Sequence, residues 1–311
     1  MKQHIQHFSM IRAIKRYALL VLCSLAFPLA ALKAQTDSSS LAPATKKKSF
    51  TKNTFEGNYV IDNQTVMVPI KGTFEFLMQH RFGTWDKGFT DLFGIFGGAH
   101  IRLAANYAPM DRLQFGAGIY SENMVVDFNS KYAILKQTKD GSMPISLTWF
   151  GNVAMDTRKK DNSTLFITFA DRLNFFNQLI VARKFTDKFS AQGSFNVTHF
   201  NNLEGYLDEN GKVQPMYENT HLSFSLGGRY KVTDKMSIIA NYDQPITQHP
   251  MNNPHPNLSG GIEIKTSGHC FQVFFANYNA ILPQYNNLYN MNDYTKGQFL
   301  IGFNINRLWN F

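Results

Sequence analysis

The chain has 311 residues, of which 44% are hydrophobic, 14% aromatic and only 17% charged. This composition is not that of a disordered protein, and the length excludes a miniprotein that depends on disulfides. Residues 1–34 hold five of the 31 basic residues and none of the 22 acidic ones, so the rest of the chain has a net charge of only +4. The sequence pI of about 9.4 overstates its basicity, and we expect no nucleic-acid partner.

The N-terminus has the pattern of an export signal. Residues 1–16 carry four basic residues and no acidic one, and residues 17–32 form an apolar run that Pro28 interrupts. An uncleaved membrane anchor needs a longer, unbroken run, so we predict a signal peptide over residues 1–34. Residues 35–53 are predicted to be a flexible polar leader, and residues 54–311 a single domain. After processing only Cys270 remains, which excludes an intramolecular disulfide.

Apolar residues alternate with polar residues from Gly72 to the end of the chain. In residues 73–82, for example, Phe74, Phe76 and Met78 share one face. Glu75 lies on the opposite face, together with Gln79 and Arg81. A period of two is typical of strands with one apolar face. The pattern recurs in about twelve segments of about ten residues, the length that a tilted strand needs to cross a bilayer.

The connections between these segments alternate in length. Short polar turns are expected at 109–112, 137–143, 186–188, 232–235 and 266–269, and longer loops at 83–98, 156–171, 201–219, 244–257 and 278–296. The exception is a tight bend at 121–124. The least clear strand is 171–185, because apolar residues fall on both of its faces, which suggests a short helix or a bulge.

A soluble β-sandwich also has alternating strands, but three features favour a membrane barrel. Full charges lie at mid-strand on the polar face, which suits a wet lumen. Aromatic residues gather at strand ends, as Phe82 and Tyr107 do. The last segment is amphipathic and ends on Phe311. We therefore predict an all-β, antiparallel, up-and-down transmembrane barrel of about twelve strands, and an even strand number places both termini on one side.

Six short segments form a recognisable set: 72–83 (GTFEFLMQHRFG), 91–94 (DLFG), 110–113 (MDRL), 178–185 (QLIVARKF), 267–273 (SGHCFQV) and 301–307 (IGFNINR). They resemble motifs of a Bacteroidota outer-membrane β-barrel family of unknown function. The resemblance extends from about Phe55 to the end of the chain. It implies a single barrel in the outer membrane of a Gram-negative cell, surrounded by lipid and with both termini in the periplasm. It implies no catalytic or ligand-binding residue.

Charged residues on the predicted lumen face are the main candidates for function. They are Glu75, Arg81, Arg102, Asp127, Lys131, Arg229, Asp243, Glu263 and Lys265. In a barrel of about twelve strands these groups either line a narrow solute path or pair across the bore and close it. The mixed signs argue against a strong preference for cations or anions.

His221 and Ser223 lie two residues apart on one strand face, an arrangement that resembles outer-membrane phospholipases. The pair points towards the lumen, however, and no Asn or Asp is placed by sequence to orient the histidine. We therefore expect the protein not to be an enzyme. The other histidines lack the spacing of metal ligands, and we expect no metal and no cofactor.

Three functions follow from this interpretation. The first is a narrow channel or solute-binding pore whose specificity depends on the lumen charges and the long loops. The second is a non-conducting accessory barrel that anchors a periplasmic protein partner through its leader. The third, minor alternative is an outer-membrane lipid hydrolase. The choice depends partly on residues 55–70, which are apolar enough to be ordered and lie either inside the barrel or beneath it.

Overall fold

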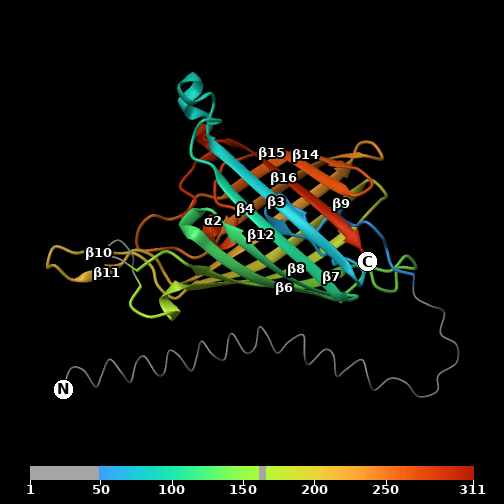
Figure 1. Cartoon of the computed structure of the whole chain (residues 1–311), viewed down its shortest axis with the longest axis horizontal. Helices are drawn as coiled ribbons and strands as arrows, with labels where there is room; N and C mark the ends of the chain where they lie inside the picture. The colour runs from blue at the N-terminus through green and yellow to red at the C-terminus, as the bar shows by residue number, and fades with distance from the viewer. Residues whose placement is uncertain (1–48, 161–165) are drawn as a thin grey trace, which may run out of the picture. The chain divides into compact units, whose positions relative to one another are not determined.

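Twelve long strands form a closed barrel in the computed structural model, which describes residues 49–160 and 166–311. The expected signal peptide 1–34 and most of the expected leader lie outside the described residues. The strands are β3 (Thr73–Thr84), β4 (His100–Met110), β5 (Leu113–Tyr120), β6 (Val125–Leu135), β7 (Ser146–Asp156), β8 (Leu173–Lys184), β9 (Phe189–Phe200), β12 (Thr220–Lys231), β13 (Met236–Pro245), β14 (Asn257–Lys265), β15 (His269–Ala276) and β16 (Leu300–Asn310). Figure 1 shows them wrapped around a common axis.

Each strand pairs antiparallel with the next long strand of the chain, and β16 pairs with β3 to close the ring. In this closing ladder Asn310 lies opposite Thr73, so the barrel begins and ends at the same rim. The predicted all-β, antiparallel, up-and-down barrel of twelve strands is confirmed.

The two rims of the barrel differ in the length of their connections. One rim, here called the short-turn end, has turns such as 232–235 and 266–268. The other, the long-loop end, has loops that contain the 3₁₀ helices η1 (Trp85–Asp91), η3 (Ala170–Arg172) and η4 (Tyr294–Lys296), the hairpin of β10 (Gly205–Leu207) and β11 (Val213–Pro215), and helix α2 (Pro283–Tyr289). The expected tight bend holds only the turn η2 (Glu122–Met124).

Side chains alternate between the inside and the outside of the barrel, as their period of two requires. In β6, Val125, Asp127, Asn129 and Lys131 are buried, whereas Phe128 is 58% exposed. Outward apolar residues of this kind recur on the other strands and give the barrel the apolar belt that a bilayer requires. Among residues 49–160 and 166–311, no helix has the length and hydropathy of a membrane span.

Residues 54–70, here called the plug, fold inside the barrel, which answers the question that the sequence left open. Strand β1 (Tyr59–Val60) pairs with β2 (Asn63–Gln64) in a small hairpin that is separate from the barrel ladder. Every plug residue from 57 to 66 is buried. Because β1 and β2 pair as strands only with each other, the barrel ring is complete without them.

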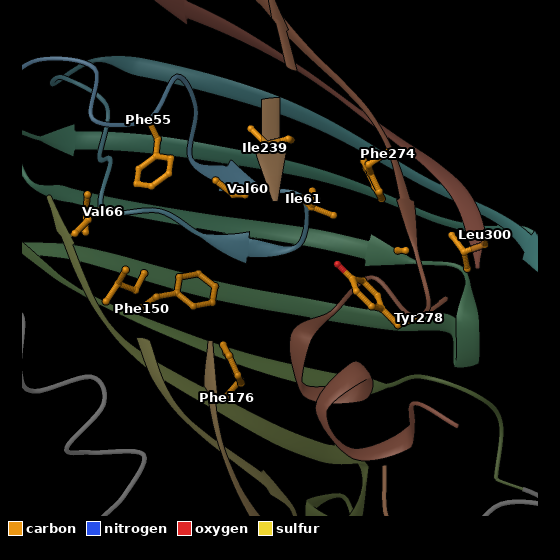
Figure 2. Close-up of a cluster of buried hydrophobic side chains, with 13 residues drawn as sticks. Phe55, Val60, Ile61, Val66, Phe150, Phe176, Ile239, Phe274, Tyr278 and Leu300 are labelled. Atoms are coloured by element: carbon orange, nitrogen blue, oxygen red, sulfur yellow. The ribbon is translucent and has the colours of Figure 1, made fainter. Parts of the chain in front are cut away.

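Plug and wall share an apolar cluster (Figure 2). Phe55, Val60, Ile61 and Val66 come from the plug; the wall provides Phe150, Phe176, Ile180, Ala182, Ile239, Phe274, Ala276 and Leu300, and Tyr278 belongs to a loop. This cluster explains the ambiguous segment 171–185. Strand β8 is regular, without the expected helix or bulge inside it, and η3 ends just before it. Its second apolar face exists because Phe176 and Ile180 receive the plug.

A second segment enters the barrel from the long-loop end. Residues 277–290, here called the lid, precede β16 and contain α2, which Figure 1 shows at this end of the barrel. Gln284 of α2 donates to the inward-facing Asn152 and Asn174 of the wall. Pro283 occupies the first turn of α2, where its missing N–H costs no hydrogen bond. Ile281, Leu282 and Leu288 of this segment are buried. The sequence predicts a loop here, but not its insertion.

Candidate functional site

The nine predicted lumen charges all lie on barrel strands. Eight of them are buried: Glu75, Arg81, Arg102, Asp127, Lys131, Arg229, Asp243 and Glu263. The ninth, Lys265, is 42% exposed near the short-turn end. Burial of full charges without partners is prohibitively costly, so their contacts show how the interior is organised.

Arg102 and Asp127 pair within the wall. The Arg102 guanidinium donates two hydrogen bonds to the Asp127 carboxylate, with N–O distances of 2.9 and 2.8 Å. Arg102 also donates to Gln79 Oε1 at 2.9 Å, and Asn152 Nδ2 donates to Asp127 at 2.9 Å. This two-point geometry is the strongest form of a charged hydrogen bond and satisfies both groups.

Arg81 connects the wall to the tip of the plug. It forms a buried ion pair with Asp62, which lies between β1 and β2. Its guanidinium also donates to Asn304 Oδ1 at 3.0 Å and lies 4.5 Å from the centre of the Phe274 ring. Neither charge is solvated, so each depends on the other, and the pair fixes the depth of the plug in the barrel.

A second charged contact lies near the start of the plug. Glu56 of the plug accepts a hydrogen bond from Arg229 Nη2 at 3.2 Å and forms an ion pair with Lys265. Arg229 Nε donates in turn to Glu263 at 2.8 Å. Glu56 therefore joins two neighbouring parts of the wall to the plug.

Three more wall charges bind plug atoms directly. Glu75 accepts from Asn58 Nδ2 at 2.5 Å, and Asp243 accepts from Asn63 Nδ2 at 2.7 Å. Lys131 Nζ donates to the carbonyl oxygens of Asn58 at 3.1 Å and Met67 at 2.9 Å. Six of the nine predicted residues contact the plug through these bonds. Arg102 lies beside Tyr59 of the plug as well as pairing with Asp127, and Glu263 pairs with Arg229 within the wall.

Plug and lid meet in the middle of the barrel at Asp62. Asn286 Nδ2 of the lid donates to Asp62 Oδ2 at 3.1 Å. Between the two segments, a gap of only about 10 Å³ is lined partly by Tyr59 of the plug and Leu282 of the lid. Such a gap is about the size of one water molecule. Burial raises the pKa of Asp62 to about 6, and the nearby Arg81 guanidinium acts in the opposite direction.

Outside the lid, the long-loop end contains a cavity of about 440 Å³, here called the vestibule. The lid contributes Tyr285 and Tyr289 to its lining, and the end of β9 contributes Phe200. The Phe200 ring packs edge to face against both tyrosine rings, with centroids 5.4 Å apart for Phe200 and Tyr285. Charged and amide groups, among them Glu204 and Arg172, line other parts. A pocket of this size and mixed lining suits a small polar molecule.

His221 and Ser223, whose spacing resembles that of outer-membrane phospholipases, have different partners. His221 Nδ1 lies 2.8 Å from His249 Nε2, and the two rings stack with their centroids 4.9 Å apart. The Ser223 hydroxyl accepts from Asn196 Nδ2 at 3.2 Å. Both His221 and Ser223 are completely buried in the barrel interior, away from any lipid substrate. Among the described residues, no cluster of three acidic, His or Cys side chains has the geometry of a metal site.

Sequence reasoning left open whether residues 55–70 lie inside the barrel, and it missed their contacts with the lumen charges and the insertion of the lid. Glu56 and Asp62 precede the first long strand, where a period of two carries no information. A weak signal was present in the lid, because Ile281, Tyr285 and Leu288 recur at helical spacing. Nothing in the sequence indicated that this short helix folds inwards.

Comparison with known proteins identifies the family of this barrel. Residues 55–309 match the family described as membrane bound beta barrel domain (DUF5777), and the chain belongs to that family. Among curated proteins, none has a matching sequence.

Several solved barrels are similar in structure, at very low sequence identity. The NanC porin is 7% identical, with a TM-score of 0.45 over 76% of this chain and 99% of the porin. The KdgM porin is also 7% identical, with a TM-score of 0.44 over 77% of this chain and 99% of the porin. The Pseudomonas putida toluene transporter TodX is 11% identical, with a TM-score of 0.35 over 85% of this chain and 94% of the transporter.

Proposed function

We propose that this membrane-bound β-barrel is an outer-membrane channel that its N-terminal plug holds closed, with both termini in the periplasm. The observation that carries the proposal is that the twelve-stranded ring closes through β16 and β3 without the plug. The plug contributes no strand to the wall. Its departure therefore leaves every backbone hydrogen bond of the barrel ladder intact, as a gate requires.

The chemistry of the wall supports this proposal. A barrel that stays closed needs no charge inside, because apolar side chains fill a small bore at lower cost. Here the wall carries five cationic and four anionic candidates, most of which bind plug atoms. When the plug leaves, these groups are ready to be hydrated and to line a polar path. The balanced charge suits neutral or zwitterionic solutes more than ions of one sign.

Single-channel conductance tests the proposal. The barrel without residues 35–71 is expected to conduct in a planar bilayer, whereas the intact chain is expected to be closed for most of the time. Circular dichroism and the heat-dependent shift in gel mobility serve as controls that both proteins fold. A folded but silent deletion variant would refute the channel.

The apolar cluster favours a second candidate, a barrel that is permanently closed and serves as an anchor. Phe55 and Ile61 of the plug are almost completely buried against the wall, and withdrawing them costs apolar burial. In this case the leader recruits a periplasmic partner. Affinity purification from intact membranes, with the leader residues 35–48 present or deleted, tests this candidate. A partner that is lost with the leader supports it, and recovery of the barrel alone under both conditions counts against it.

On either proposal the protein is not an enzyme and uses no cofactor. The buried positions of His221 and Ser223, each bonded to another residue, support this view. Release of fatty acid from phospholipid by the purified protein, lost in Ser223→Ala, would overturn it.

A further inference from the structure

The first loop of the long-loop end exposes an unusual amount of apolar surface. Residues 85–98, here called the apolar loop, connect β3 to β4 and contain six large hydrophobic residues that are exposed. Phe89 and Phe96 are the most exposed of them, at 84% and 79%. The others are Trp85, Leu92, Phe93 and Ile95. Six exposed apolar side chains within one short loop, with the Phe89 and Phe93 rings in contact, favour aggregation in water and so indicate a contact with another apolar phase.

The apolar loop holds this exposed arrangement through its own hydrogen bonds. The amide of Phe93 donates to the Gly88 carbonyl at 2.6 Å, and the amide of Phe96 donates to the Asp91 carbonyl at 3.0 Å. The Asp91 carboxylate also accepts from the amide of Gly94 at 2.9 Å. Phe93 adopts a φ of 55°, a left-handed conformation that is unfavourable for a bulky residue. The loop is therefore a defined structure that presents its rings outwards.

Gly94 fixes the apolar loop against the end of β3. A Cβ atom at this position would lie 2.1 Å from the carbonyl oxygen of Gly83, and Gly94 has a φ of 85°. Only glycine therefore allows this approach of the two backbones. The contact sets the direction in which the loop leaves the barrel, and Figure 1 shows the segment between β3 and β4 projecting away from the wall.

The base of the apolar loop is continuous with the lipid-facing wall. The Trp85 ring packs against Phe275 at 5.6 Å and Phe299 at 6.0 Å between centroids. Phe275 is an outward residue of β15 and is 48% exposed. The Trp85 indole N–H donates to the Gly297 carbonyl at 2.6 Å. An indole with an apolar body and a satisfied polar tip, directly above the apolar belt, is typical of the boundary between lipid tails and headgroups.

We propose that the apolar loop is a membrane anchor that inserts Phe89 and Phe96 into the lipid leaflet at the long-loop end. The occupant of the surface is the bilayer itself, because the loop extends the lipid-facing wall through Trp85. The apolar loop also holds Asp86, Lys87 and Asp91. Its six exposed hydrophobic residues nevertheless outnumber those of the β10–β11 hairpin, where only Tyr206, Leu207 and Val213 are exposed around the charged turn 208–212. The anchor is independent of whether the barrel conducts.

Depth-dependent fluorescence quenching tests the anchor. We would place a single tryptophan by Phe96→Trp in a chain with Trp85→Phe, Trp149→Phe and Trp309→Phe, and reconstitute it in phosphatidylcholine vesicles. Leu207→Trp in the same background is the control, because residue 207 is also exposed at the long-loop end. Brominated phosphatidylcholine is expected to quench residue 96 strongly, and more so with shallow than with deep bromines. Aqueous acrylamide is expected to quench residue 207 instead.

Two results would overturn the anchor. In the first, acrylamide quenches the tryptophan at residue 96 as strongly as the one at residue 207, and brominated lipid quenches neither. The second is shielding of residue 96 from both quenchers that increases with the ratio of protein to lipid, since this would assign the surface to a second copy of the chain. Gel mobility that still shifts on heating confirms that each tryptophan variant is folded.

Discussion

The buried charges are the residues on which closure of the barrel depends. Arg81 and Asp62 are 0% and 3% exposed, and each has its ionic partner on the other side of the plug–wall boundary. A buried ion pair contributes little compared with an apolar pair, but removal of one partner is strongly destabilising because it leaves a bare charge. The pairs therefore specify one position for the plug rather than maximise stability.

The wall pair of Arg102 and Asp127 offers the first prediction. Replacement of Arg102 by Ala leaves Asp127 buried without its two guanidinium hydrogen bonds, so we expect a loss of about 3–5 kcal/mol in the free energy of unfolding. Lys231→Ala is the matched control, because Lys231 pairs with the almost fully exposed Asp234 and its loss costs no more than about 1 kcal/mol. Urea unfolding in detergent, followed by tryptophan fluorescence, measures both. Equal effects would contradict the prediction.

Asp62 gives the closed state a pH dependence. Burial raises its pKa from the ordinary 3.8 to about 6 when the plug is docked, with Arg81 opposing the rise and Asp243 adding to it. The docked plug therefore holds a proton that the free plug has lost between about pH 4 and pH 6. The proton on Asp62 therefore stabilises the docked plug. This stabilisation is fully present below about pH 4 and is lost as the pH rises through about 6.

The second prediction follows from this linkage. Channel openings should be more frequent at about pH 7.5 than at about pH 5, and Asp62→Asn should flatten the dependence, because the amide still accepts from Arg81 but does not titrate. Single-channel recording at both values measures the change in each protein. A dependence that persists unchanged in Asp62→Asn would assign it to another group.

Sequence periodicity predicted which residues face the interior but not their partners. Glu75 on β3 and Lys131 on β6 were each predicted to face the interior, because alternate residues of a strand share one face. Their partner Asn58 lies outside the strands, and its position depends on how the plug folds back through the ring. No local pattern encodes such a contact.

The sequence of strand β8 reflects its contact with the plug. Its outward residues face lipid and its inward residues Phe176 and Ile180 face the plug, so both faces are apolar, as in a strand buried on both sides. The ambiguity of 171–185 in the sequence was therefore a structural signal. The suggested bulge is absent and only residues 171 and 172 belong to the short helix η3; the apolar residues on both faces reflect the plug instead.

The third prediction concerns this face of β8. Phe176→Ala removes a completely buried ring from the cluster, and such changes cost about 3–5 kcal/mol. This loss of free energy should weaken the docking of the plug and leave the barrel intact. The amides of residues 57–66 should therefore exchange hydrogen faster, while those of the barrel strands remain protected. Leu179→Ala, on the outer face and 44% exposed, is the control. Hydrogen exchange followed by mass spectrometry separates the segments, and unchanged protection of the plug in Phe176→Ala would refute its dependence on this cluster.

For the whole molecule, the architecture was largely predictable and the closure was not. Alternation over about ten residues and two classes of connection are enough to predict a membrane barrel of about twelve strands. The register that joins Asn310 to Thr73 then closes the ring. Plug and lid lie outside these rules, because they are held by side chains from many strands and contribute nothing to the barrel ladder.

A reversible crosslink between plug and wall tests whether the plug is the gate, because the rest of the chain stays unchanged. Thr148 Oγ1 of the wall donates to the Val66 carbonyl of the plug at 3.1 Å, so we would introduce Val66→Cys and Thr148→Cys in a Cys270→Ser background. Single-channel recording at about pH 7.5 then compares the reduced protein with the oxidised protein, whose crosslink is verified by mass spectrometry. If the plug is the gate, the reduced protein opens, the openings disappear on oxidation, and they return with reductant. Identical traces in the two redox states, whether silent or open, would contradict this prediction.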